Sequence, residues 1–205
     1  MTGNRGASYL NVSRETSERL EILETLMRKW NPAINLVSRN SLTDLWERHI
    51  ADSIQVFRCV EARGHWVDLG SGGGFPGLVV AILAATECPD LTVTLVESDQ
   101  RKSAFLRRVI RDTGIPCQVR TERIEVLEPQ QADILSARAL ADFGRLLEFA
   151  DRHLKPGGLA LFPKGATWQK EVEAARSQWK FRAKTIMSKL DAQAVILQVE
   201  GISRV

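Results

Sequence analysis

A glycine-rich turn between a predicted strand and a predicted helix constrains the fold more than any other feature. The stretch from Val67 to Leu83 reads VDLGSGGGFPGLVVAIL, and five glycines fall within its positions 70–77. Glycines there allow positive φ angles and let a ligand approach the backbone closely. Pro76 stands near the first helical position, where its fixed φ is tolerated. The turn predicts a doubly wound α/β sheet with a ligand at the carboxyl end of this strand.

The sequence after His65 alternates short β-rich runs with amphipathic helical runs. Strands are expected near 66–69, 91–97, 116–120, 133–137, 158–163, 181–187 and 194–199, and helices near 76–85, 100–113, 141–154 and 167–178. Alternation of this kind indicates right-handed βαβ units and a mostly parallel sheet, here of seven strands. Because no helix separates the last two strands, they are expected to form a hairpin that makes one strand antiparallel.

The first 64 residues have a different pattern. Ser13–Trp30 carries apolar residues at helical spacing. Pro32 is expected to end this helix, because the residue before a proline avoids the α region. A second helix is expected from Ser41 to about Val60. The sequence therefore predicts an N-terminal helical region, 1–64, packed on a core domain, 65–205.

Composition and charge exclude several classes of protein. The chain has 205 residues, of which 44% are hydrophobic and 26% charged, as in soluble globular proteins. It has no run of the ~20 apolar residues that a membrane span requires, and its start lacks the apolar stretch of a secretory signal. Three separated cysteines without a CxxC argue against a disulfide framework or a zinc site. We expect a cytoplasmic protein without a metal, and the net charge of +3 permits an anionic partner.

The residues around the turn point to an adenosine-containing ligand. Gly72, Gly74 and Gly77 satisfy GxGxxG, and Glu97 ends the next predicted strand 20 residues after Gly77. A carboxylate at that place can accept hydrogen bonds from both ribose hydroxyls. These features fit a dinucleotide as well as S-adenosylmethionine.

Three features favour S-adenosylmethionine. Asp68 precedes the glycines, and a carboxylate there suits an ammonium and a sulfonium better than a pyrophosphate, although it could also be an acid near a helix N-terminus. About 65 residues precede the turn, whereas dinucleotide domains often begin close to their first strand. The LKPGG turn at 154–158 resembles the one in class I S-adenosylmethionine-dependent methyltransferases.

Two methyl acceptors are disfavoured. The region after the fourth predicted strand, ADILSARALADF at 132–143, has no Asn/Asp-Pro-Pro-aromatic stretch of the kind often found in enzymes that methylate exocyclic amines. Methylation of a cytosine carbon needs a thiolate. Cys117 stands at the third predicted strand rather than the fourth, so a small core residue is the better interpretation.

Six short motifs occur in this sequence in an order that resembles the order in one known family. They are WNPAINLVS (30–38), ERHIADS (47–53), DLGSGGGFPG (68–77), RIE (123–125), SARA (136–139) and PKG (163–165). The pattern is similar to the ribosomal RNA small subunit methyltransferase G family, also called glucose-inhibited division protein B. The resemblance implies methyl transfer to the position-7 nitrogen of guanosine 527 in 16S rRNA. That nitrogen carries no proton, so its attack requires no general base.

The resemblance also implies roles for individual residues. For binding S-adenosylmethionine it indicates Gly70, Ser71, Gly72, Phe75, Glu97, Ile124, Glu125 and Arg138. For positioning the substrate it indicates Arg138, Arg123, Asn35 and His49. An arginine that grips guanine at both O6 and the position-7 nitrogen would block the lone pair. Arg123 or Arg138 is therefore expected to hold a phosphate, the cofactor carboxylate or O6 alone.

Structural interpretations remain open for three of these residues. Arg138 can be an exposed salt bridge, and His49 shares a helical face with Trp46 and Ile50, so it can be a hydrogen-bonded structural histidine. Asn35 can hold a turn after Pro32.

The expected partner is 16S rRNA or the small ribosomal subunit, bound by a monomer. The stretch Arg101–Arg111 has five basic residues and no acid, and it is either a phosphate-facing helix or a solvated outer face. Gln193 stands where many family members have a basic residue. Two other functions stay open, a non-catalytic RNA-binding assembly factor on a methyltransferase scaffold and an NAD-dependent oxidoreductase.

Overall fold

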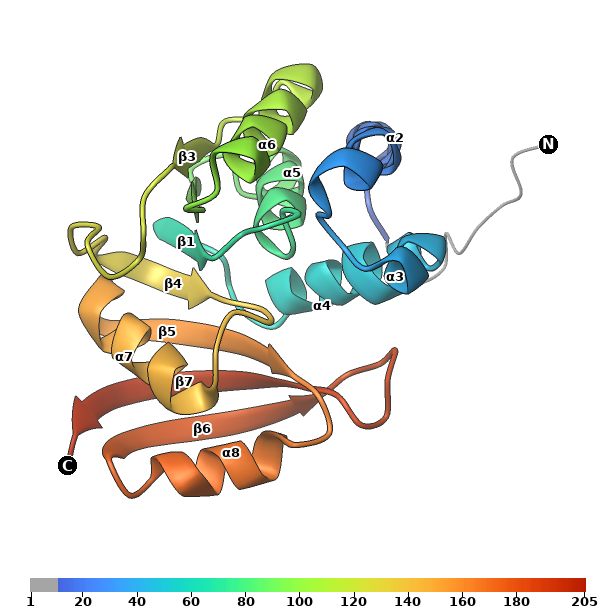
Figure 1. Cartoon of the computed structure of the whole chain (residues 1–205). Helices are drawn as coiled ribbons and strands as arrows, with labels where there is room; N and C mark the ends of the chain where they lie inside the picture. Colours follow the sequence, from blue (N-terminus) through green and yellow to red (C-terminus); the bar gives the residue numbers. More distant parts are fainter. Residues whose placement is uncertain (1–10) are drawn as a thin grey trace.

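The structure, a computed structural model, describes residues 11–205 and contains one seven-stranded sheet (Figure 1). The strands are β1 His65–Leu69, β2 Thr92–Val96, β3 Gln118–Arg120, β4 Ala132–Ser136, β5 Leu154–Lys164, β6 Trp179–Met187 and β7 Val195–Arg204. Their order in the sheet is β3-β2-β1-β4-β5-β7-β6. β1 to β5 pair in parallel, whereas β7 is antiparallel to both β5 and β6. The doubly wound fold with a final hairpin is confirmed.

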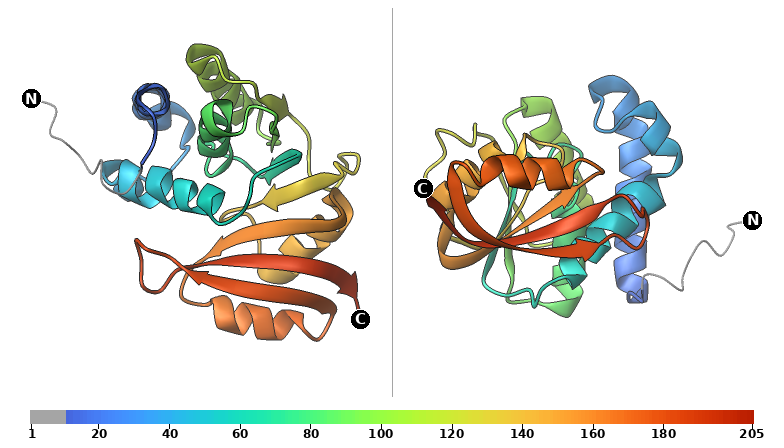
Figure 2. Two further views of the ribbon diagram at one scale, coloured as in Figure 1. Left: turned by 180° about the vertical axis from the view of Figure 1, so that it is seen from behind. Right: turned by 90° about the horizontal axis from the view of Figure 1, so that it is seen from below.

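Helices cover both faces of this sheet (Figure 2). They are α2 Arg14–Ile34, α3 Arg39–Thr43, the π-helical turn η1 Trp46–Ala51, α4 Asp52–Arg58, α5 Gly77–Glu87, α6 Gln100–Thr113, α7 Phe143–His153 and α8 Trp168–Ala175. Side chains of successive strand residues alternate between the two layers. Trp66 packs with α2, α4, α5 and α6 on one face, and Val67 packs with α7 and α8 on the other.

The N-terminal helices rest on the first of these layers. α2 contacts both α5 and α6, and Leu20, Leu23 and Met27 are completely buried there. Each such side chain contributes about 2 kcal/mol through removal of apolar surface from water. α5 is buried from Gly77 to Ala84, as expected for a helix that is apolar on all sides.

The expected end of the first helix at Pro32 is wrong, because α2 continues to Ile34. Pro32 falls in the last turn of α2, so its missing N–H removes a single backbone hydrogen bond near the end of the helix. Asn35 then adopts a left-handed conformation with φ 54°, and its N–H donates to the Asn31 carbonyl at 3.0 Å. The buried Asn31 side chain accepts from the Val37 N–H at 2.8 Å. These local hydrogen bonds outweigh the tendency of Asn31, the residue before the proline, to avoid the α region.

The second predicted helix is wrong in its start and its continuity. Ser38, rather than Ser41, is the N-cap, since its side chain accepts from the Ser41 N–H. The segment then divides into α3, the π turn η1 and α4 before ending at Arg58. A π turn is rare and often marks a functional site. Here it contains His49.

No helix within residues 11–205 is long and apolar enough to cross a membrane. In the same range, no three His, Cys, Asp or Glu side chains come together as a possible metal site.

Candidate active site

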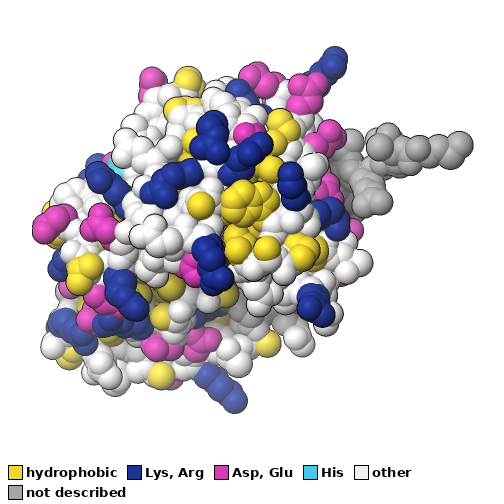
Figure 3. All heavy atoms as spheres, turned by 45° about the horizontal axis from the view of Figure 1, so that its top comes forward, with side chains coloured by type: hydrophobic (Ala, Val, Ile, Leu, Met, Phe, Trp, Pro, Cys, Tyr) yellow, Lys and Arg dark blue, Asp and Glu magenta, His cyan; other side chains and the backbone are white. Residues whose placement is uncertain are grey.

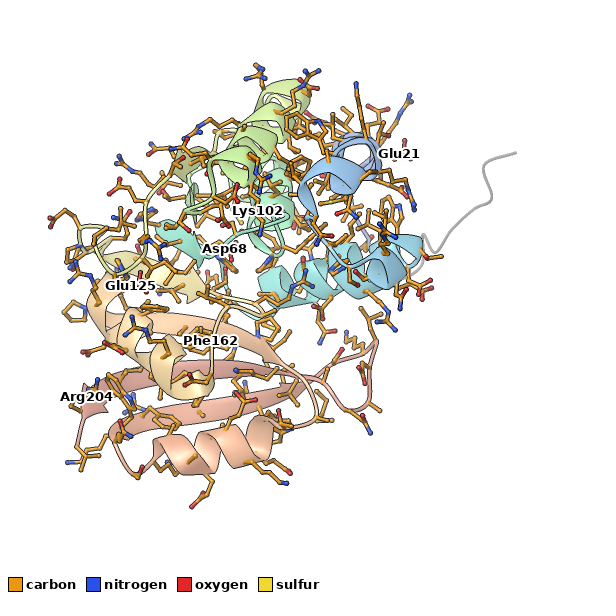
Figure 4. All side chains as sticks on the ribbon, viewed as in Figure 1. Glu21, Asp68, Lys102, Glu125, Phe162 and Arg204 are labelled. Atoms are coloured by element: carbon orange, nitrogen blue, oxygen red, sulfur yellow. The ribbon has the colours of Figure 1, made fainter. Side chains whose placement is uncertain are left out.

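A cavity of about 850 Å³ opens at the carboxyl ends of β1 to β4. The strand order in the sheet reverses between β1 and β4, and doubly wound folds bind ligands at this switch point. The wall is formed by segments that follow the four strands and by the α2–α3 connection. It includes Gly70–Gly73, Phe75, Glu97, Arg123–Glu125 and Arg138–Ala141, together with Leu36–Ser38 and Ser41. Lys102, at the start of α6, and Glu125 also border it (Figure 4).

Ten of the eleven candidate residues from the sequence lie in this wall. They are Gly70, Ser71, Gly72, Phe75, Glu97, Ile124, Glu125, Arg138, Arg123 and His49. Asn35 is exposed and ends α2, outside the residues that line the cavity.

Two positions of the turn require glycine for different structural reasons. Gly70 has φ 65°, and a Cβ there would lie 2.5 Å from the Leu140 side chain. A Cβ on Gly77 would lie 2.4 Å from Leu95 and 2.6 Å from Asp68 Oδ2, so this glycine lets α5 approach the sheet. Ser71 fixes the turn between them, donating from its N–H to the Val96 carbonyl at 3.0 Å.

Glu97 holds the turn from the neighbouring strand. Its Oε2 accepts from the Gly72 N–H at 2.8 Å and its Oε1 accepts from the Asp99 N–H at 2.8 Å. The side chain is buried at the cavity wall. Each carboxylate oxygen retains a lone pair that can accept from a hydroxyl.

Asp68 lies beneath the turn rather than in the cavity wall. Its Oδ1 accepts from the Ser136 hydroxyl at 2.6 Å, and that hydroxyl accepts from the Trp66 indole at 2.9 Å. Burial raises the pKa of Asp68 to about 6, although hydrogen bonding to Ser136 and the charge of Arg138 oppose the shift. Its Oδ2 is buried and has no hydrogen-bond partner within residues 11–205. This oxygen faces the start of α5, since a Cβ on Gly77 would lie 2.6 Å from it.

Arg138 is mostly buried behind the fourth strand, with 17% of its side chain exposed. Its Nη2 donates to His49 Nδ1 at 2.7 Å, and its Nη1 lies 3.4 Å from Asp52 Oδ2. The guanidinium also lies over the Phe75 ring, 5.3 Å from the centroid. Burial lowers the Arg138 pKa, while the Asp52 and Asp68 carboxylates raise it. Arginine remains charged under these conditions, so Arg138 supplies a fixed positive charge to the cavity.

His49 combines the structural interpretation with a place in the cavity wall. Its ring stacks on Phe75, with centroids 4.9 Å apart and planes at 21°. Since arginine has no acceptor, His49 Nδ1 must accept and the proton of the neutral ring must be on Nε2. Burial and the charges of Arg138 and Arg48 lower the His49 pKa to about 4. Nε2 is a buried donor without a partner within the described residues.

The segment Arg123–Leu127 is held by α7, which the sequence did not indicate. The completely buried His153 donates from Nε2 to the Ile124 carbonyl at 3.1 Å. Arg152 donates to the Leu127 carbonyl at 2.8 Å. Arg145 pairs with Glu125 at 3.1 Å. Three side chains of one helix thus orient the segment that borders this end of the cavity.

The sequence also gave no role to the part of the wall contributed by the α2–α3 connection and α3. Leu36, Val37, Ser38 and Ser41 line the cavity. A Cβ on Gly73 would lie 3.1 Å from the Leu36 carbonyl, so the α2–α3 connection touches the glycine turn. The WNPAINLVS motif was the available signal, because it ends in these residues.

Comparison with known proteins adds a family. The family model described as rRNA small subunit methyltransferase G matches residues 16–196. A Ruegeria pomeroyi protein named ribosomal RNA small subunit methyltransferase G is 62% identical over 97% of this chain and 98% of its own. Proteins of the same name from Ruegeria sp. and Rhodospirillum centenum are 54% and 52% identical, over 100% and 94% of this chain and 100% and 87% of theirs.

Solved structures support the fold. A ribosomal protein L11 methylase from Lactobacillus delbrueckii subsp. bulgaricus has a TM-score of 0.59 at 14% identity, over 75% of this chain and 78% of its own. A TehB-like SAM-dependent methyltransferase from Corynebacterium glutamicum has a TM-score of 0.58 at 14% identity, over 88% and 98%. At these identities the likeness concerns the fold alone.

Proposed function

The chain belongs to the ribosomal RNA small subunit methyltransferase G family, and we propose that it methylates the position-7 nitrogen of guanosine 527 in 16S rRNA. S-adenosylmethionine is the cofactor, as the sequence predicted. The observation that carries the proposal is the match to relatives of that name over almost the whole of both chains. The monomeric state and cytoplasmic location expected from the sequence belong to the same proposal.

The cavity has groups suited to each part of this cofactor. Glu97 would accept from the ribose hydroxyls, and Ile124 and Phe149 give an apolar wall for the adenine. Arg138 would hold the carboxylate of the amino-acid part, since its guanidinium is fixed by His49 and Asp52. When bound, S-adenosylmethionine supplies an electrophilic methyl group on a positively charged sulfur.

The residues of the chain need only to position the guanine and to tolerate positive charge. The position-7 nitrogen is already nucleophilic, so a neutral His49 is not required to remove a proton. Placement of nucleophile and methyl group alone is worth about 7–11 kcal/mol. A neutral His49 adds no positive charge where the base becomes cationic. At pH 7 the ionised Asp68 below the turn stabilises the positive charge of the base.

The two other functions predict different results. An NAD-dependent oxidoreductase is disfavoured by the family match, which covers both the glycine turn and the RHIADS motif. A non-catalytic RNA-binding factor would bind small subunits without turnover.

The test is methyl transfer from labelled S-adenosylmethionine to small ribosomal subunits that lack this modification. We expect one 7-methylguanosine per subunit. Arg138→Ala is expected to lower kcat/KM on the order of 100-fold, because a preoriented charged donor is lost. Arg108→Ala, on the outer face of α6 and paired with Asp112, is the matched control. Absence of label in subunits and in naked 16S rRNA would contradict the proposal, and S-adenosylhomocysteine binding would then separate another methyl acceptor from a non-catalytic factor.

A further inference from the structure

Four lysine and arginine side chains border the cavity, and two of them form ion pairs whereas the other two do not. Arg138 is paired with Asp52, and Arg145 is paired with Glu125 and Glu148. The side chains of Lys102 and Arg123 make no ion pair or hydrogen bond with any residue in the range 11–205. Lys102 is half-buried and Arg123 is exposed. These two charges are therefore available to an anion at the cavity.

The local structure of α6 directs Lys102 toward the cavity. Asp99 caps the helix by accepting from the N–H groups of Arg101 and Lys102, at 2.8 and 3.1 Å. The buried face of the helix begins at Ser103. Lys102 is the residue of α6 that lines the cavity.

The other arginines of α6 lie in different surroundings. Arg108 pairs with Asp112 at 2.7 Å, and Arg101 lies 3.5 Å from Asp99. Arg107 donates to Thr121 Oγ1 at 2.6 Å. Arg111 is exposed and does not line the cavity. Lysine and arginine side chains surround an apolar area on the face seen in Figure 3. The basic character of this face therefore does not by itself identify the side chains that bind an anion.

An anionic ligand is the partner that this arrangement fits. Two carboxylates of the cavity wall, Glu97 and Glu122, make no ion pair within residues 11–205. Glu97 is held by the N–H groups of Gly72 and Asp99, whereas Glu122 adjoins Arg123 in the sequence and partly offsets the two cations. The one carboxylate of the cofactor is held by Arg138 in the proposed binding mode, which leaves Lys102 and Arg123 to another anion. A phosphodiester backbone brings one negative charge per nucleotide and is held by lysine and arginine.

We propose that Lys102 binds a backbone phosphate of the rRNA next to the nucleotide that enters the cavity, beside Arg123, for which the family resemblance already implied an anion, and that the outer arginines of α6 do not. The inference rests on the proposed function for the identity of the RNA. It divides the basic helix into one functional residue and a solvated face.

The experiment measures binding to small ribosomal subunits that lack the modification, at several salt concentrations, in the presence of S-adenosylhomocysteine. Lys102→Ala and Arg123→Ala should each weaken binding several-fold and lower the slope of log K against log salt by about 1. Lys102→Glu should weaken binding further. Lys102→Ala should leave the Kd for S-adenosylhomocysteine unchanged. Arg108→Ala and Arg111→Ala are the matched controls and should change neither quantity.

Three results would overturn the proposal. An unchanged salt slope in Lys102→Ala would remove Lys102 from the RNA contact. A parallel loss of S-adenosylhomocysteine affinity would assign it to the cofactor. An equal loss of slope in Arg108→Ala or Arg111→Ala would assign the RNA to the outer face. Failure of the proposed function is read separately, as wild-type protein that binds subunits but transfers no methyl group to them.

Discussion

At the scale of the residue, the hydrogen bond between His49 and Arg138 determines the tautomer of His49, and burial keeps its ring neutral. Arg138 can only donate, so His49 must present Nδ1 as an acceptor. A second proton on the ring would remove that acceptor and would face Arg138 and Arg48. Asp52 is the carboxylate that balances Arg138, and burial raises its pKa. The sequence indicated His49 and Arg138 separately, but it gave no sign of their contact.

We predict that His49 stays neutral, with its proton on Nε2, from pH 8 to pH 5. Nitrogen-15 NMR of the imidazole reports both the tautomer and the titration. The folded pKa of about 4 lies below the unfolded value of 6.5. The unfolded chain therefore binds more protons in this interval, and the stability contributed by His49 is present above pH 6.5 and is lost as the pH falls toward 4.

His49→Gln is the comparison variant because it cannot titrate. Its Tm should fall less than that of the wild type between pH 7 and pH 5. His65, His153 and Asp68 titrate in both proteins and cancel in the difference. Titration of His49 near pH 6.5, or a proton found on Nδ1, would contradict the structure at this site.

At the scale of the element, the alternation of strands and helices was predictable because hydrophobic periodicity is local. The glycine turn, the final hairpin and α6 follow from such patterns. Three features do not: α2 continues through Pro32, η1 inserts a π turn, and α7 holds the Arg123–Leu127 segment. Each depends on contacts between residues distant in sequence, or on side-chain hydrogen bonds that compete with backbone preferences.

The packing of α5 on the sheet gives a prediction about stability. Gly77→Ala should destabilise the protein by about 1–3 kcal/mol, because the added Cβ meets Leu95 and Asp68 at under 3.0 Å. Gly165→Ala is the matched control, since a Cβ there meets nothing within 4 Å and the residue has no positive φ. It should change the free energy of unfolding by less than about 0.5 kcal/mol. Equal effects in urea unfolding would show that Gly77 is not needed for this close approach.

At the scale of the whole molecule, the sequence predicted the fold, the cofactor and ten residues of the cavity wall. The motifs are short and contiguous, so the residues that follow each parallel strand were recognisable. The wall from Leu36 to Ser41 was not foreseen, because it depends on how α2 packs on α5 and α6. The division into 1–64 and 65–205 stays a prediction, and the cavity draws residues from both parts.

The central claim is that this cavity delivers a methyl group to one guanine nitrogen. The most direct measurement uses cells without their own enzyme of this family that express the chain. Their 16S rRNA is treated with borohydride and aniline, which cleave the strand at 7-methylguanosine. We predict a single cleavage at nucleotide 527 with the wild-type chain and a weaker cleavage at the same nucleotide with Arg138→Ala. Intact RNA at that nucleotide, with methyl groups found elsewhere or nowhere, would contradict the account.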